Sequence, residues 1–163
     1  MLVLLSITPL LTLFALIILG LRAKKFIWSE DAFSELNSVR GLSLAFKAVI
    51  LFLILAETIF IFWKFETIVF EVVFPIFLLV ISFIFDAKNS IHKILAFLSF
   101  AVVIFVFVKL SILIGFMPLL LTILMVIIGI TILIFEIIKV RQPYWLFEGL
   151  VMILITVWNF AVL

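Results

Sequence analysis

Three ionisable side chains lie inside long apolar stretches of the sequence, a position in which ionisable groups are rare. They are Glu57, Glu71 and Lys109. A charge in membrane hydrocarbon costs several kcal/mol unless it is paired, hydrated or neutralised. Two neighbouring carboxylates can exchange a proton or hold a cation, and an ammonium group can offset their charge. We therefore take the three as candidate proton- or ion-binding residues, or as polar contacts to a quinone or lipid headgroup.

The spacing of these residues suggests that they share one depth. Each lies five to seven residues from an expected helix end, which corresponds to roughly 7–10 Å below the surface. Glu57 and Glu71 are symmetric about Lys64, so a hairpin that turns there would bring them level. A structural alternative is also open, and it is favoured by the distance of all three residues from the bilayer centre. In it, Glu57 pairs with Lys64 on the same helical face, while Glu71 and Lys109 extend to water.

The amino-acid composition predicts which kind of secondary structure positions these side chains. Of the 163 residues, 69% are hydrophobic and 12% are charged, whereas soluble domains are roughly half apolar and about a quarter charged. The surplus apolar surface must face lipid, where only helices and closed barrels pair all backbone groups. The apolar runs are continuous and long enough for helices. We expect an all-α, polytopic integral membrane bundle that forms a single transmembrane domain over residues 1–163.

The apolar runs predict about six transmembrane helices. We expect them at residues 2–21, 44–63, 65–85, 94–114, 118–138 and 144–163. The apolar stretch from Ile94 to Ile138 is too long for one span, and Gly115 and Pro118 offer turn chemistry within it. Pro75 is expected to kink the third span.

A polar stretch follows the first span and predicts one short interfacial helix. Ser29 is a suitable N-cap, and Glu30 and Asp31 suit the first helical turn. Phe33 and Leu36 would then share an apolar face. We expect an amphipathic helix at about residues 29–40, lying at the membrane surface.

Basic residues predict the orientation. Nine of the eleven would lie on one side of a six-span bundle and two, Lys64 and Lys109, on the other. Because basic loops stay in the cytoplasm, this asymmetry predicts that both termini lie outside, N-out and C-out. Several aromatic residues fall near predicted span ends and are expected to anchor at the headgroups. They are Trp28, Trp63, Tyr144, Trp145 and Trp158.

The remaining ionisable residues favour structural roles. His92 is the single histidine, so the chain cannot ligate a haem between two imidazoles of its own. We expect His92 to be an exposed or interfacial loop residue. Glu136 is three residues before Lys139 and can pair with it. Glu148 is expected to reach the cytoplasmic headgroups or the basic residues near Arg141.

Motifs for catalysis are missing from the sequence. The chain has no cysteine, so it can form no disulfide, thiolate metal site or iron–sulfur cluster. We also find no phosphate-binding glycine loop, metal-binding histidine motif or nucleophile elbow. We therefore expect no catalytic residues, cofactor or metal in this chain, and no enzyme activity of its own.

These observations leave two functional hypotheses. The first is an accessory, non-catalytic subunit of a larger hetero-oligomeric membrane complex, a respiratory or redox complex by base rate. It would pack against a core subunit and line a quinone or proton path. The second is a stand-alone small transporter or proton/cation carrier that uses the intramembrane carboxylates. The expected partners are the lipid bilayer and other membrane subunits, with no nucleic acid because the net charge is only +2. A prokaryotic plasma membrane is the expected location.

Overall fold

The computed structural model describes residues 1–24, 26–65, 76–78, 80–82, 84–85, 89–138, 140 and 142–163. Within these ranges all regular structure is helical. Four helices are long and apolar enough to cross a membrane: α3 (Ser43–Phe65), α5 (Ser90–Ile114), α6 (Phe116–Ile138) and α7 (Tyr144–Val162). The predicted class, an all-α multi-pass membrane protein, is therefore confirmed. The number of spans and the N-out/C-out orientation stay predictions.

Two consecutive helices occupy the first apolar run. These are α1 (Leu2–Ser6) and α2 (Thr8–Arg22), which meet at Ile7. Pro9 explains the interruption, because its ring lacks an N–H and clashes with the carbonyl four residues earlier. The hydroxyls of Ser6 and Thr8 donate to backbone carbonyls of the preceding turn. The run at 2–21 is thus helical but not one continuous helix.

Gly115 separates α5 from α6, where the sequence predicts a turn. Its φ is +144°, in a region that side-chain-bearing residues rarely adopt. Its N–H still bonds to the carbonyl of Ser111 at 3.0 Å. Pro118 lies in the first turn of α6, where its missing N–H has no helical partner to lose.

At its other end, α5 begins at Ser90, earlier than the expected 94. The Asn89 side chain caps it by accepting the N–H of Ile91 at 2.8 Å. The expected third span at 65–85 and the expected kink at Pro75 lie largely outside the described residues.

The short helix after α2 differs from the expected one. It is the 3-10 helix η1 (Phe33–Ser38), which follows an extended Ala32. Ser29 lies in a turn instead of capping a helix, and Asp31 closes that turn by accepting the N–H of Ile27 at 2.7 Å. Phe33 and Leu36 share one face because a 3-10 helix has three residues per turn. Both are buried against protein. Because Ser29 lies in a turn and the 3-10 helix covers only Phe33–Ser38, the expected helix at 29–40 is wrong.

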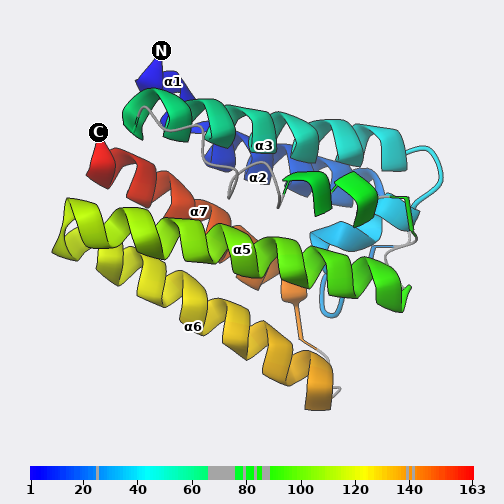
Figure 1. The fold of residues 1–163 in the computed structure, drawn as a ribbon. Helices are drawn as coiled ribbons and strands as arrows, with labels where there is room; N and C mark the ends of the chain where they lie inside the picture. Colours follow the sequence, from blue (N-terminus) through cyan, green and yellow to red (C-terminus); the bar gives the residue numbers. More distant parts are fainter. Residues whose placement is uncertain are drawn as a thin grey trace.

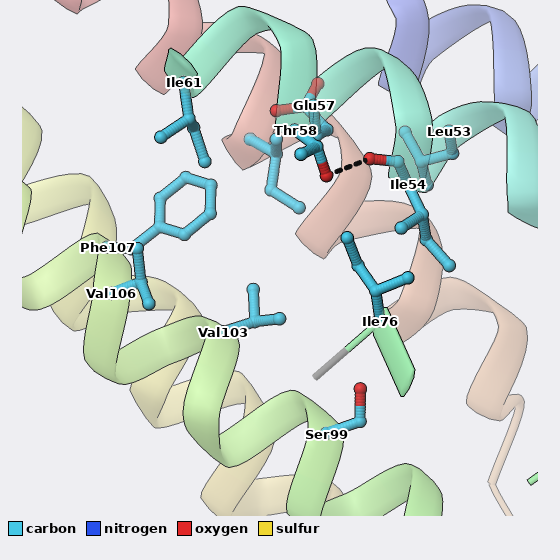
Figure 2. Close-up of a pocket in the computed structure, with 11 residues that line it drawn as sticks. Leu53, Ile54, Glu57, Thr58, Ile61, Ile76, Ser99, Val103, Val106 and Phe107 are labelled. Atoms are coloured by element: carbon cyan, nitrogen blue, oxygen red, sulfur yellow. Dashed lines mark hydrogen bonds between the residues drawn. The ribbon is translucent and has the colours of Figure 1, made fainter. Parts of the chain in front are cut away.

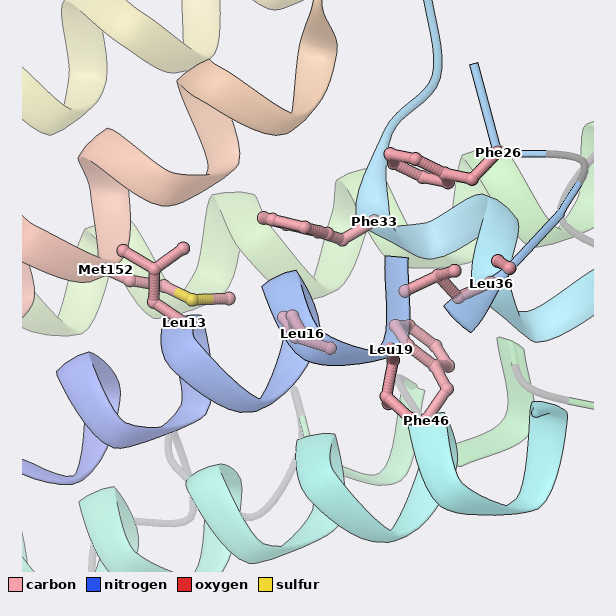
Figure 3. Packing of buried hydrophobic residues seen from close by; sticks show 9 residues of the cluster. Leu13, Leu16, Leu19, Phe26, Phe33, Leu36, Phe46 and Met152 are labelled. Atoms are coloured by element: carbon pink, nitrogen blue, oxygen red, sulfur yellow. The ribbon is translucent and has the colours of Figure 1, made fainter. Parts of the chain in front are cut away.

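Two clusters of buried apolar side chains form the core. The first joins α2, η1, α3 and one residue of α7, and Figure 3 shows its side chains between these helices. The second joins α3, α5, α6 and the last turns of α7. Both α3 and α7 contribute to the two clusters, and α7 packs against both α2 and α6. Figure 1 shows α7 lying between these helices, and it shows both chain termini at the same end.

Candidate functional site

Glu57 on α3 and Asn159 on α7 form a polar pair inside the bundle. The Asn159 side-chain nitrogen donates to both carboxylate oxygens of Glu57, at 2.9 Å and 3.2 Å. The Asn159 side chain is fully buried. Lys64, the alternative partner, instead donates to the carbonyl of Leu163 at 2.9 Å. Glu57 therefore binds a neutral amide on another helix and not the lysine two turns away on its own.

The hydrogen-bonding capacity of this pair is incompletely used. Asn159 Oδ1 is buried and has no hydrogen-bond partner among the described residues, a property that it shares with Thr12 Oγ1. A carboxylate can only accept hydrogen bonds, whereas a protonated carboxyl can also donate one. Protonated Glu57 could thus donate to Asn159 Oδ1 while accepting from Asn159 Nδ2. The pair can hold a proton with both amide atoms satisfied.

A mainly apolar cavity of about 140 Å³ borders Glu57, between α3 and α5. Leu53, Ile61, Val103 and Phe107 contribute to its wall. In Figure 2 the carboxylate oxygens of Glu57 point away from Val103, so the cavity meets the aliphatic part of that side chain. Glu57 therefore has a mainly apolar surface on one side and the Asn159 amide on the other.

The hydroxyl of Thr58, at the wall of the cavity, is bonded to backbone. Thr58 lies next to Glu57 on α3, and its hydroxyl donates to the carbonyl of Ile54 at 2.7 Å, as Figure 2 shows. Such bonds to the preceding turn are common for hydroxyls in membrane helices. Thr58 contributes no free donor to the pair.

The structure describes two of the three predicted residues. Glu57 lies inside the bundle, and Lys109 is exposed on α5. Glu71 lies outside the described residues, so its expected level beside Glu57 stays a prediction. Asn159 was missed by the sequence reasoning. The sequence feature that could have identified Asn159 is an amide side chain within the last apolar run, because buried amides in membranes form hydrogen bonds to other helices.

A chain of buried hydrogen bonds lies next to the pair. Trp158 Nε1 donates to the Ser111 hydroxyl at 2.7 Å, and the hydroxyls of Ser111 and Thr122 are 2.8 Å apart. Thr122 donates to the carbonyl of Pro118 at 2.9 Å. Trp158, expected as a headgroup anchor, is fully buried. That expectation is wrong, because the indole N–H finds its acceptor inside the protein.

The expected loop position of His92 is also wrong. Since α5 begins at Ser90, His92 lies in its first turn, and it is 4% exposed. Its Nδ1 donates to the carbonyl of Ser82 at 2.8 Å. A carbonyl only accepts, so Nδ1 carries a proton. His92 ties α5 to the segment before it.

Glu148 and Glu136 have partners other than the expected ones. Glu148 accepts the backbone N–H of Phe33 at 2.5 Å, and also that of Ser34. It caps η1, and Arg141, near which it was expected, lies outside the described residues. Glu136 on α6 pairs with Lys93 on α5, while its expected partner Lys139 lies outside the described residues.

No three histidine, aspartate or glutamate side chains gather as metal ligands among the described residues. Comparison of the chain with protein-family models, with curated proteins and with solved structures gives no match.

Proposed function

We propose that this multi-pass membrane protein binds and releases a proton at Glu57 and acts as a small proton or cation carrier. The observation that carries the proposal is the Glu57–Asn159 pair, in which a carboxylate faces a neutral amide inside the bundle. A carboxylate buried with a neutral partner keeps its charge only at a high cost. Uptake of a proton removes that cost and lets the carboxyl donate to Asn159 Oδ1, which otherwise lacks a donor.

Two states of the pair follow from this chemistry. In the charged state, Asn159 Nδ2 donates to both Glu57 oxygens. In the neutral state, the carboxylic acid and the amide exchange two hydrogen bonds in a ring. The two states hold α3 and α7 together differently, so proton binding can be linked to a shift between these helices. Glu71 and Lys109 are proposed to complete the site as a second carboxylate and a countercharge.

Proton flux through the purified protein in liposomes tests the proposal. A pH-sensitive dye inside the vesicles should report decay of an imposed pH gradient with the natural chain. Glu57→Gln should abolish that decay, because the amide cannot carry the proton. Glu136→Gln is the matched control, since it makes the same change at an exposed ion pair. Unchanged flux in Glu57→Gln would exclude Glu57 as the proton carrier.

We propose as a second candidate an accessory subunit of a hetero-oligomeric respiratory or redox complex. What favours it is the breadth of exposed apolar surface, with large side chains such as Phe105, Ile112 and Ile137 more than half exposed. These surfaces can pack against lipid or against a core subunit. Purification of the tagged chain in mild detergent distinguishes the two. Stoichiometric recovery of cofactor-bearing proteins supports the subunit, and a colourless chain alone argues against it.

A further inference from the structure

We propose that Trp158 is a positioning residue for the Glu57–Asn159 pair, acting through the hydrogen-bond chain that links it to Ser111, Thr122 and Pro118. The inference rests on the proposed function for its biological meaning. Its structural content, that this chain sets where Asn159 lies, can be tested separately.

Counting donors and acceptors shows which group donates in every bond of this hydrogen-bond chain. The Trp158 indole can only donate, and the Pro118 carbonyl can only accept. Thr122 uses its single hydroxyl proton on Pro118, so Ser111 must donate to Thr122. Each donor in the chain is therefore used once, and each hydroxyl both accepts and donates. Loss of any member leaves a neighbouring buried group unpaired, which costs about 1–3 kcal/mol.

The hydrogen-bond chain connects the last turns of α7 to two other helices. Ser111 belongs to α5, and Thr122 and Pro118 belong to α6. The exposed fraction of Trp158, Ser111 and Thr122 is zero. The Trp158 ring also packs against Phe107 of α5, with ring centroids 4.5 Å apart. This part of α7 is thus held to α5 and α6 by both polar and aromatic contacts.

Asn159 follows Trp158 directly, and this adjacency connects the two features. Neighbouring residues on an α-helix point about 100° apart. The Trp158 indole bonds to Ser111 of α5 and its ring packs against Phe107 of α5 and Phe65 of α3, while Asn159 bonds to Glu57 of α3. A rotation of α7 about its axis would move both side chains together. By resisting that rotation, Trp158 holds the Asn159 amide within hydrogen-bonding distance of the Glu57 carboxylate.

Selective ¹⁵N labelling of asparagine offers a direct readout. The chain has three asparagines, Asn37, Asn89 and Asn159, so the side-chain NH₂ spectrum of the full protein in nanodiscs is simple. Asn159→Ser assigns the resonance of interest, and the other two asparagines serve as internal references. A pH series then follows the Asn159 signal in the natural chain and in Glu57→Gln.

Thr122→Val is the informative variant, because it breaks the chain and leaves the Trp158 ring in place. We expect it to shift the Asn159 signal and to change the proton affinity of the pair by about threefold or more, as loss of one hydrogen bond implies. Thr122→Ser, which keeps the hydroxyl, should restore both. Thr131→Val is the matched control on α6, since the Thr131 hydroxyl bonds only to the carbonyl of Ile127. Thr131→Val should change neither the Asn159 signal nor the proton affinity of the pair.

The outcomes separate the two proposals. If Thr122→Val leaves the position and the titration of the Asn159 signal unchanged, the positioning role of this chain is wrong. If the signal shifts in Thr122→Val and returns in Thr122→Ser, the positioning role is supported. If the Asn159 signal of the natural chain shows no pH dependence that Glu57→Gln removes, the proton site is wrong. The shift caused by Thr122→Val still decides the positioning role in that case.

Discussion

At the scale of single residues, Glu148 shows how a buried carboxylate can serve the fold and not a reaction. It accepts N–H groups from the start of η1, although Phe33 lies 115 residues earlier in the chain. The first N–H groups of a helix have no partner within it, and a carboxylate suits them in charge. Trp145, one turn before Glu148, adds a bond from its indole to the carbonyl of Trp28 at 2.6 Å. The start of α7 therefore holds the connection between α2 and α3.

Glu148→Ala should loosen this connection. Hydrogen bonds to a charged group contribute about 1.5–3 kcal/mol each, so we expect a loss of at least about 2 kcal/mol in unfolding free energy. Trypsin should also cut faster between α2 and α3, where Arg22, Lys24 and Arg40 lie. Glu148→Gln keeps an acceptor oxygen and should lose less. Equal stability and equal cleavage of Glu148→Ala and the natural chain would contradict the capping role.

At the scale of elements, turns and caps decide where the apolar runs divide. Gly115 ends α5 with a backbone conformation that few residues adopt, and Asn89 starts the same helix with a side-chain cap. The Gly115 turn brings Ser111 and Thr122 face to face, so the hydrogen-bond chain depends on it. The end of α5 and the buried hydrogen bonds of Ser111 and Thr122 therefore depend on the same turn.

Gly115→Ala tests this dependence. A Cβ at this φ and ψ costs about 1–3 kcal/mol, and we expect a corresponding loss of stability in thermal unfolding of the detergent-solubilised protein. No atom lies within 4 Å of the added Cβ, so the loss would come from backbone strain and not from a clash. Phe116→Ala, at the exposed next residue, is the control and should change stability little. A Gly115→Ala protein as stable as the natural one would contradict the assigned turn.

At the scale of the whole molecule, the ends of the bundle differ in character. Both chain termini and the α5–α6 turn lie at one end, whereas the polar connection after α2 and the starts of α5 and α7 lie at the other (Figure 1). Arg22, Lys24, Arg40 and Lys93 belong to elements that meet at this second end. With both termini outside, as predicted, this second end would face the cytoplasm, where the positive-inside rule places basic residues.

Thiol labelling checks the orientation, and the lack of native cysteine makes single variants simple to read. Phe116→Cys and Ser90→Cys place exposed thiols at opposite ends of α5. With both termini outside, a membrane-impermeant maleimide should label Phe116→Cys in intact cells, and Ser90→Cys only after permeabilisation. The reverse pattern would invert the orientation. Labelling of both from outside would show that α5 does not cross the membrane.

The sequence by itself determined the class of the protein and much of its helical pattern. Long apolar runs must become helices in lipid, because each backbone group has to find a partner within its own segment. That reasoning is local, so it also located the turn at Gly115. It was less successful in the polar stretch before α3, where a 3-10 turn and the distant Glu148 replaced the expected α-helix.

The tertiary structure decided which polar side chains meet. Glu57 and Asn159 are 102 residues apart, and Trp158 and Ser111 are 47 apart, so no local pattern links them. Nearly uniform apolar helices leave the rotation of each helix undetermined from sequence, because every face is compatible with lipid. Packing chooses that rotation, and with it the partners of Glu57, Trp158 and Glu148.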